Sequence, residues 1–374
     1  MMMNVAFYCA TFEKNVSGIN RYTRGILDGI KNQEIKKHCF GQNSLHAEDM
    51  VELHTVHKMN QAYDGYAEKE RYLLCKLAGI DVLYSFYSPI CLDGDTGIKS
   101  VLTIYDLTPL INIEWHMNNK QLYDMFDIEI RKSAQNVNKI VTISEASKKS
   151  IVDIYGIPED KIEIVTPAIA EDLIITERTE EEMQDVRRKY AIRDSYILSI
   201  CTFEPRKNMI SLIKAYEMYR DKNKTASVQL VLTGKLGWGY GNLLDMIYGS
   251  KYKEDIIMTG YVSDYDLGSL YKGAMVFAYV SYFEGFGMPV LEALNYGKAV
   301  LTSDTTSMPE VGGDAVCYCN PYELESVYSS LEHLLEDAEY REKLHKKAKT
   351  QAEKFSYEKS AKKVEELLFR LDRR

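Results

Sequence analysis

The sequence predicts an α/β protein built from two domains. Short apolar runs that suit buried strands, such as 275–280 and 299–301, alternate with segments that suit helices. The chain has 374 residues, enough for two domains that each bury their own core. Hydrophobic residues make up 45% and charged residues 27%, the composition of a soluble globular protein.

The predicted elements follow one another in two similar halves. In the first half, strands are predicted at 5–10, 81–86, 100–104, 139–143 and 162–165, and helices at 20–30 and 145–155. In the second half, strands are predicted at 196–200, 228–232, 256–259, 275–280 and 300–302, and helices at 179–190, 209–219, 290–296 and 338–374, the last broken near 355–357. The predicted domains are 1–170 and 195–354, with a linker and helix at 171–194 and a terminal helix at 355–374.

Several classes of protein are disfavoured by composition. The net charge of −9 argues against nucleic acid as a partner, because phosphate binding needs a surplus of Lys and Arg on one face. No run of 18 apolar residues suits a membrane span. Docking to an acidic membrane would have to use a local basic patch, with Lys36-Lys37 and Lys148-Lys149 as candidates, although solvated helix faces are the expected explanation of both pairs.

The seven cysteines are odd in number and scattered through apolar runs, which predicts reduced core residues in a cytoplasmic protein. Cys317 and Cys319 are two apart, but no second pair of ligands stands at the spacing that a zinc site requires. The first predicted strand and helix resemble the start of a doubly wound domain. Their connection lacks Gly-x-Gly-x-x-Gly, which argues against NAD.

The segment from Glu284 to Glu292 is the most informative stretch of the chain. It has the sequence EGFGMPVLE and lies between a predicted strand and a short predicted helix. Pro289 suits the first turn of that helix, and Gly297 suits the residue just after its end. Glu284 is therefore expected in the loop and Glu292 on the helix.

This arrangement suits a nucleotide sugar. Gly285 and Gly287 let the backbone approach a ligand closely, and the N–H groups at the start of the helix can bind a diphosphate. Carboxylates accept hydrogen bonds from vicinal hydroxyls, so Glu284 and Glu292 suit a sugar and a ribose on either side of that diphosphate. The alternative is a tight strand-to-helix turn with two solvated carboxylates.

The nine-residue string resembles the signature of the retaining glycosyltransferases of family 4, which have the GT-B fold of two Rossmann-like, doubly wound domains. Further segments match that family in the same order and cover nearly the whole chain. They are 17–22 (SGINRY), 105–110 (YDLTPL), 203–208 (FEPRKN), 259–264 (TGYVSD) and 307–312 (SMPEVG).

The resemblance implies transfer of a hexose from a nucleoside diphosphate sugar, with retention at the anomeric carbon. GDP-mannose or a UDP-hexose is the expected donor, and a sugar hydroxyl of a glycan or lipid-linked acceptor is the expected target. The second domain would hold the donor and the first the acceptor, on either side of a cleft, with the terminal helix crossing back to the first domain. No metal or other cofactor is expected, because fixed cations can neutralise the diphosphate. A lipid-linked acceptor would bring a cytoplasmic enzyme to the inner face of the membrane.

The resemblance also implies roles for single residues. Glu284 would hold donor-sugar hydroxyls, Asp106 would orient or deprotonate the acceptor hydroxyl, and Arg206 and Lys207 would neutralise the diphosphate. The implied donor-binding residues are Gly18, Tyr105, Gly234, Tyr261, Val262, Gly285, Phe286, Gly287, Met288 and Glu292.

The sequence departs from the family at Tyr105, where the family usually has histidine. A phenol with a pKa near 10 cannot replace imidazole as an acid or base at neutral pH, although it can donate a hydrogen bond. An alternative is therefore a catalytically weak or silent homologue that binds a nucleotide sugar or a partner enzyme. A nucleotide-sugar epimerase shares the fold and is a further alternative, which turnover of the donor without an acceptor would indicate.

Overall fold

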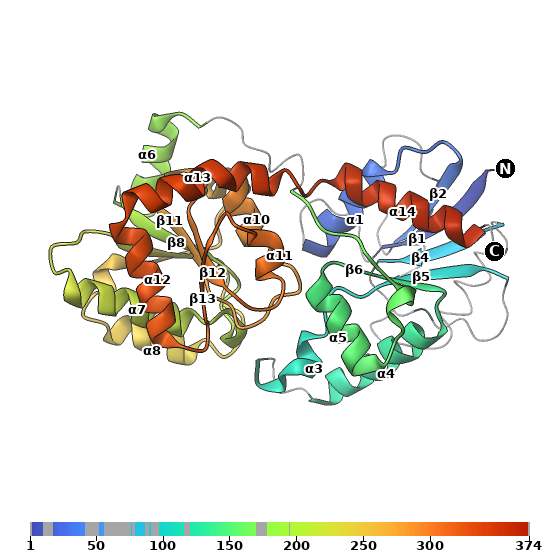
Figure 1. The fold of residues 1–374 in the computed structure, drawn as a ribbon, viewed down its shortest axis with the longest axis horizontal. Helices are drawn as coiled ribbons and strands as arrows, with labels where there is room; N and C mark the ends of the chain where they lie inside the picture. The colour runs from blue at the N-terminus through green and yellow to red at the C-terminus, as the bar shows by residue number, and fades with distance from the viewer. Residues whose placement is uncertain are drawn as a thin grey trace. The chain divides into compact units, whose positions relative to one another are not determined.

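The computed structural model describes residues 2–9, 18–41, 52–55, 76, 79–86, 90, 97–115, 120–169, 178–193 and 195–372. It divides into two compact units (Figure 1). Unit 1 contains residues 1–107, 120–170 and 356–374, and unit 2 contains residues 108–119 and 171–355. Within the predicted linker and helix at 171–194, residues 171–177 and 194 lie outside the described residues.

Unit 1 is built on a seven-stranded sheet whose described strands all pair in parallel, in the order β3-β2-β1-β4-β5-β6-β7. Its strands are β1 (Met3–Tyr8), β2 (Ile35–Gly41), β3 (Glu52–Thr55), β4 (Val82–Ser85), β5 (Lys99–Thr103), β6 (Lys139–Thr142) and β7 (Ile162–Ile164). Its helices are α1 (Gly18–Gly29), α4 (Lys120–Asn136), α5 (Glu145–Tyr155), the 3₁₀ turn η2 (Glu159–Lys161) and α14 (Tyr357–Asp372).

Unit 2 is built on a six-stranded parallel sheet in the order β10-β9-β8-β11-β12-β13. Its strands are β8 (Tyr196–Ile200), β9 (Gln229–Thr233), β10 (Ile256–Gly260), β11 (Val276–Tyr279), β12 (Val300–Ser303) and β13 (Cys317–Cys319). Its α-helices are α3 (Thr108–Ile111), α6 (Glu180–Lys189), α7 (Met209–Lys222), α8 (Gly241–Gly249), α9 (Asp264–Gly273), α10 (Met288–Asn295), α11 (Met308–Gly312), α12 (Leu324–Glu336) and α13 (Ala338–Ala352), with 3₁₀ turns η1 (Ile113–Trp115), η4 (Pro205–Lys207) and η5 (Lys253–Asp255).

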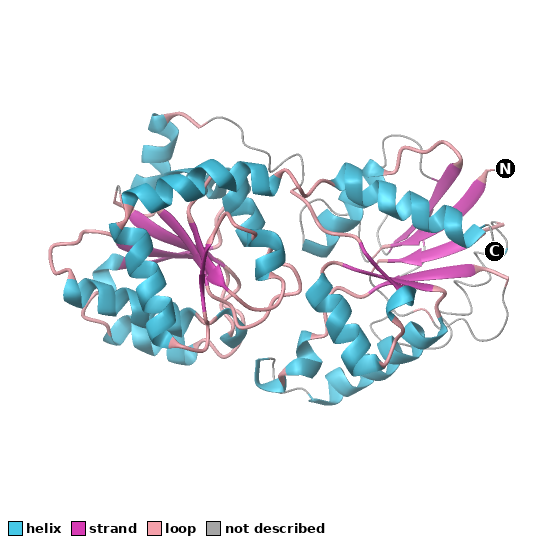
Figure 2. Ribbon diagram, viewed as in Figure 1, coloured by secondary structure: helices cyan, strands magenta, loops and turns pink. Residues whose placement is uncertain are grey.

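Helices cover both faces of each sheet, which explains why the central strands are mostly apolar (Figure 2). The burial of β9, β11 and β12 is complete along their length. In both sheets the strand order reverses once, between β1 and β4 in unit 1 and between β8 and β11 in unit 2. Ligands of such sheets bind beyond the carboxyl ends of the strands at this switch point.

Helix α14 follows unit 2 in the chain but packs against α1 in unit 1. Small residues allow the close approach: a Cβ atom on Gly25 would lie 2.5 Å from the Tyr357 ring, and one on Gly29 would lie 2.7 Å from the Cβ of Ala361. Glu365 adds a polar contact, because its carboxylate accepts hydrogen bonds of 2.9 Å from the backbone N–H groups of residues 31 and 32.

One boundary differs from the prediction. Residues 108–119 were expected in the first domain, but the structure groups them with unit 2. The reason is an anchor at Trp115: its ring stacks on Tyr282 with centroids 5.8 Å apart, and its carbonyl accepts a 2.7 Å hydrogen bond from the Trp238 indole.

The expectation that Lys36-Lys37 and Lys148-Lys149 lie on solvated helix faces is wrong for the first pair. Lys37 lies on β2, and its Nζ donates hydrogen bonds to the carbonyls of Leu27 and Ile30 at the end of α1. Lys148 and Lys149 do lie on α5, where they pair with Glu159 and Asp153. Among the described residues, no helix is long and apolar enough to span a membrane.

Candidate functional site

The loops that follow β8 and β11 meet at the switch point of unit 2. The first of these loops carries Glu204, Arg206 and Lys207, the last two within the 3₁₀ turn η4. The second loop carries Glu284. The backbone joins the two loops directly, because the N–H of Tyr282 donates a 3.0 Å hydrogen bond to the carbonyl of Arg206.

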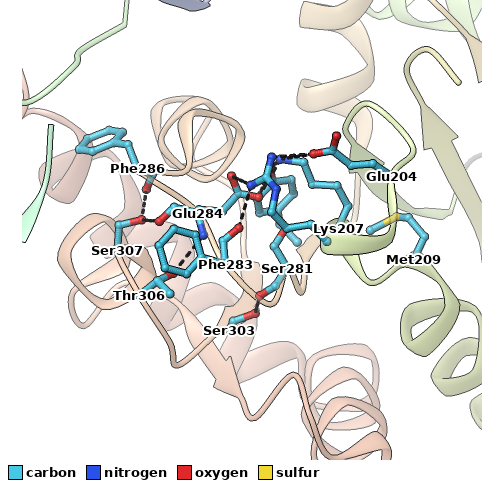
Figure 3. Close-up of polar contacts among 12 residues, drawn as sticks. Glu204, Lys207, Met209, Ser281, Phe283, Glu284, Phe286, Ser303, Thr306 and Ser307 are labelled. Carbon is cyan, nitrogen blue, oxygen red and sulfur yellow. Dashed lines mark hydrogen bonds and ion pairs between the residues drawn. The ribbon is translucent and has the colours of Figure 1, made fainter. Parts of the chain in front are cut away.

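Glu284 is the centre of a buried network of charges (Figure 3), with only 7% of its surface exposed. Its Oε1 accepts hydrogen bonds from Lys207 Nζ at 2.7 Å and from the Tyr279 hydroxyl at 2.9 Å. Its Oε2 accepts a 2.8 Å hydrogen bond from Arg206. An ionised carboxylate has about four acceptor positions, so these three hydrogen bonds leave room for a ligand hydroxyl.

The same cations hold a second carboxylate. Arg206 Nη2 donates a 2.6 Å hydrogen bond to Glu204 Oε1, and Lys207 Nζ lies 4.0 Å from the same oxygen. The cluster therefore contains two formal positive and two formal negative charges. Such a cluster is stable in a buried position only because each charge has a partner.

The network keeps Glu284 ionised. Burial by itself would raise the pKa of the Glu284 carboxyl, but Lys207 and Arg206 outweigh burial and hold that pKa at about 2. Burial likewise works to lower the pKa of Lys207, and the opposing effects of Glu284 and Tyr279 raise it instead. For Glu204 the balance differs, since burial raises its pKa despite the nearby cations. At neutral pH Glu284 can thus only accept hydrogen bonds.

The backbone of the Glu284 loop is fixed by the residues that follow β12 (Figure 3). Thr306 Oγ1 accepts from the Glu284 N–H at 3.2 Å, and Ser307 Oγ donates to the carbonyls of Glu284 and Phe286. Gly287 has a φ of 99°, and a Cβ atom there would lie 2.2 Å from the Met308 methyl group. The positive φ favours glycine here, and a side chain would also have to displace the Met308 methyl group.

Helix α10 begins at Met288, directly after this loop, with Pro289 in its first turn as predicted. Phe286 is buried and Gly285 lies between it and Glu284. On the helix, Glu292 is half-buried and its Oε2 accepts a 2.7 Å hydrogen bond from the Tyr271 hydroxyl. The ring of Tyr271 stacks on Tyr296 at 5.1 Å, so the group that orients Glu292 is itself fixed.

The remaining predicted residues of unit 2 lie beyond the ends of β9 and β10. Gly234 has a φ of 139°, and a Cβ atom there would lie 1.8 Å from the carbonyl oxygen of Cys201, so no other residue fits. Val262 is buried, whereas Tyr261 is 68% exposed and has the Lys235 ammonium 4.9 Å from its ring centroid. Gly234 is thus explained by packing, independently of any ligand.

Three predicted residues belong to unit 1. Gly18 is the exposed first residue of α1, and residues 10–17 lie outside the described residues. Tyr105 follows β5 and packs edge-on against Tyr22, with ring centroids 5.6 Å apart, and Asp106 comes next and is half-buried. Burial, followed by the neighbouring Tyr84, raises the pKa of Tyr105 well above its usual range, so this phenol stays protonated at neutral pH.

Sequence reasoning missed three members of these networks: Glu204, Tyr279 and Tyr271. Glu204 stands beside the predicted cations in the sequence, and that position was its only signal. The two tyrosines lie in apolar surroundings and suit core positions. Cys317 and Cys319 are buried free thiols, and no group of metal ligands was found among the residues that the structure describes.

Comparisons with known proteins show which family this chain belongs to. Residues 182–351 match the family model described as Glycosyl transferases group 1. O-antigen chain mannosyltransferase B of Escherichia coli is 32% identical over 275 residues, which are 73% of this chain and 70% of that protein. The serotype-specific mannosyltransferase WbdA of Escherichia coli is 29% identical over 269 residues, 71% of this chain but only 33% of that longer protein.

The fold is also that of solved glycosyltransferase structures. The Anabaena protein HepE, solved in complex with UDP and glucose, has a TM-score of 0.71 and 14% sequence identity, with 98% of this chain and 99% of HepE covered. The predicted GT-B class of two Rossmann-like α/β domains is therefore confirmed.

Proposed function

Because the chain belongs to the group 1 glycosyltransferases, we propose that it transfers a hexose from a nucleoside diphosphate sugar to a sugar hydroxyl of a glycan or lipid-linked acceptor. We further propose that the anomeric configuration is retained and that no metal ion takes part. The observation that carries the proposal is the contact of Glu284 with Arg206 and Lys207 at the switch point of the second sheet.

In the proposed reaction, the bond between the anomeric carbon and the diphosphate oxygen breaks while the acceptor oxygen bonds to that carbon. Negative charge develops on the departing diphosphate, and the fixed cations Arg206 and Lys207 stabilise it. Glu284 accepts hydrogen bonds from the donor hydroxyls in its remaining acceptor position. The proton of the acceptor hydroxyl leaves with the help of Asp106 or of the diphosphate itself.

The names of relatives support a choice of substrates. Two relatives from Escherichia coli are named as mannosyltransferases, one of them for the O-antigen chain, which favours GDP-mannose and a growing polysaccharide. HepE was solved with UDP and glucose, which keeps a UDP-hexose as the second candidate. With a lipid-linked acceptor, the enzyme would work at the cytoplasmic face of the membrane.

The donor site is tested by calorimetry. GDP-, UDP-, ADP- and dTDP-sugars are titrated without metal into the natural protein and into the Glu292→Ala variant. We expect one nucleotide to bind selectively, and the variant to bind it about 10- to 100-fold more weakly, because a carboxylate that accepts from the ribose diol is lost. Tyr271→Phe should weaken binding less, since it removes only the hydroxyl that orients Glu292.

Glu325→Ala is the matched control, because Glu325 is an exposed glutamate on α12. It should bind the donor as the natural protein does. If no nucleotide sugar binds, the proposed function is wrong. If Glu292→Ala binds as well as the control, the donor site stands but the ribose is held by other groups.

Tyr105 supports a second candidate function, a homologue that binds the donor without turning it over. Its ring is packed against Tyr22, and its protonated phenol cannot serve as an acid or base at neutral pH. Binding of the donor without measurable transfer would be the signature of such a protein.

Replacing Tyr105 by His separates the two candidates. If the natural protein is silent, Tyr105→His should raise turnover from near zero by about 10²-fold or more while the donor affinity is unchanged, because an imidazole then stands at the family position. In an active enzyme the same change should leave turnover equal or lower. Tyr105→Phe is the control, since it has the ring without any titratable group.

A further inference from the structure

An aromatic column in unit 2 has no part in the donor site described above. It consists of Trp115, Tyr282 and Tyr322. Tyr282 is the central ring, with Trp115 stacked at 5.8 Å and an interplanar angle of 6°, and Tyr322 stacked at 5.0 Å and 27°. Tyr282 therefore has two ring partners, while Tyr322 is 63% exposed.

Hydrogen bonds fix the backbone at Tyr322, the exposed end of the column. The backbone N–H of Tyr322 donates a 3.0 Å hydrogen bond to Asn320 Oδ1, and the preceding carbonyl, of Pro321, accepts from Asn208 Nδ2 at 2.9 Å. Asn208 directly follows η4 and is buried. An exposed ring on such a fixed backbone loses little conformational entropy when it binds a ligand, because only two side-chain torsions remain.

Polar groups lie at the same edge of the sheet. Residues 303 and 319 are paired across β12 and β13, so the next residues, Asp304 and Asn320, lie side by side at the carboxyl ends. The Asp304 N–H donates a 2.9 Å hydrogen bond to the Cys319 carbonyl, and its side chain is exposed. An aromatic face beside a carboxylate and an amide matches a pyranose ring, which has a face of C–H groups and a rim of hydroxyls.

The column shares a loop with the candidate site, because Tyr282 and Glu284 both lie in the loop after β11. Tyr282 precedes Glu284 by two residues, about 7 Å of extended chain. It also donates its backbone N–H to the Arg206 carbonyl. The ring on which Tyr322 stacks is thus joined through its backbone to both loops of the candidate site.

We propose that the exposed face of Tyr322, with Asp304 and Asn320 beside it, binds an internal sugar of the acceptor glycan and makes the enzyme prefer oligosaccharide acceptors over single sugars. This proposal rests on the proposed glycosyl transfer. It adds that the enzyme selects acceptors by their length. A neutral glycan fits better than an anionic ligand, because the exposed charged residues Asp304 and Glu323 are both acidic.

The two tryptophans of the chain provide the readout. Trp115 belongs to the column, and the Trp238 indole donates to the Trp115 carbonyl, so both tryptophans lie in the column or in contact with it and intrinsic fluorescence reports on it. The probes are α-mannotetraose, maltotetraose and cellotetraose, each compared with the corresponding monosaccharide. The natural protein should show a saturable change with at least one tetrasaccharide and bind it more tightly than the monosaccharide.

Three variants at Tyr322 and one control test the role of the ring. Tyr322→Ala and Tyr322→Leu should bind the tetrasaccharide about tenfold more weakly, while Tyr322→Phe should keep most of the affinity because its ring still stacks. Tyr248→Ala is the control: Tyr248 is 72% exposed on α8, and no ring partner was found for it among the described residues. It should bind as the natural protein does.

The outcomes separate the subsite from the proposed function. Failure of every nucleotide sugar to bind in the calorimetric panel would remove the proposed function itself. With donor binding intact, the subsite is refuted if no tetrasaccharide binds, or if Tyr322→Ala binds it as tightly as Tyr248→Ala. It is also refuted if Tyr322→Ala weakens nucleotide binding instead, because the Tyr322 ring would then bind the base of the donor nucleotide. Dimerisation lost in Tyr322→Ala, measured by light scattering, would assign the ring to a second copy of the chain.

Discussion

Glu284→Gln should lower the rate of sugar transfer by about 10²- to 10³-fold while the protein stays folded. The variant keeps the shape of the side chain but removes the charge that Lys207 and Arg206 surround. The amide nitrogen of the glutamine would also place a hydrogen-bond donor opposite the donor groups of Lys207 or Arg206. Initial rates with the donor identified by calorimetry give the measurement, and circular dichroism confirms the fold.

Glu325→Gln, an exposed change of the same kind on α12, should retain the natural rate. A Glu284→Gln variant with turnover like this control would mean that the carboxylate serves only the internal network. A loss of rate together with normal donor affinity would place its effect on the reaction step, because binding in the ground state would be unchanged.

Lys207→Met is the second variant with a large expected effect. Removing this buried ammonium leaves Glu284 with Arg206 as its remaining cation, and breaking such a buried pair typically costs about 3–5 kcal/mol of unfolding free energy. Urea unfolding followed by tryptophan fluorescence measures this loss, since both tryptophans, Trp115 and Trp238, belong to unit 2. The double variant Lys207→Met/Glu284→Gln should recover part of the stability, because the unpaired charge is then removed as well.

The control is Lys222→Met, which breaks an exposed pair with Glu332 and should leave the urea midpoint nearly unchanged. If Lys207→Met were no more harmful than Lys222→Met, the network would not contribute to stability. If the double variant were as unstable as Lys207→Met, packing of the lysine chain would account for the loss.

The same network predicts a dependence on pH. The folded pKa of Glu284, about 2, lies below its ordinary value of 4.5, so this group stabilises unit 2 fully above pH 4.5. The contribution is lost as the pH falls from 4.5 toward 2. In Lys207→Met the Glu284 pKa should rise toward 4.5, so the acid-induced loss of stability should be smaller than in the natural protein and should be complete at a higher pH.

Most of the described strands could be predicted from the sequence, whereas helices α3, α4, α8, α9, α11 and α12 and strands β2, β3 and β13 were not predicted. Strand β8 at Tyr196–Ile200 and the end of α5 at Tyr155 agree with their predicted bounds, because apolar runs and Gly156 mark them clearly. Helix α4 was not predicted. Its residues Ile128 and Ile130 alternate with Glu129 as in a strand, and Ile128 is 61% exposed, so the local pattern conflicts with the helix.

The contacts within the site could be predicted only in part. The resemblance pointed to Glu284, Arg206 and Lys207 singly, as groups for the sugar and the diphosphate. Their direct pairing depends on β8 and β11 being neighbours although two strands intervene in the chain, and no local pattern contains that information. The aromatic column was missed for the same reason, since Trp115 and Tyr322 are far apart in the sequence.

The place of α14 has a consequence for the order in which the protein can be completed during synthesis. The ribosome makes the strands of unit 1 first, but the face of α1 around Gly25 and Gly29 has no cover until α14 emerges. At the usual rate of 5–20 residues per second, the interval between residue 170 and the end of α14 is about 10 to 40 s. Throughout this time unit 1 has an open apolar face, whereas unit 2 can close its own core before synthesis ends.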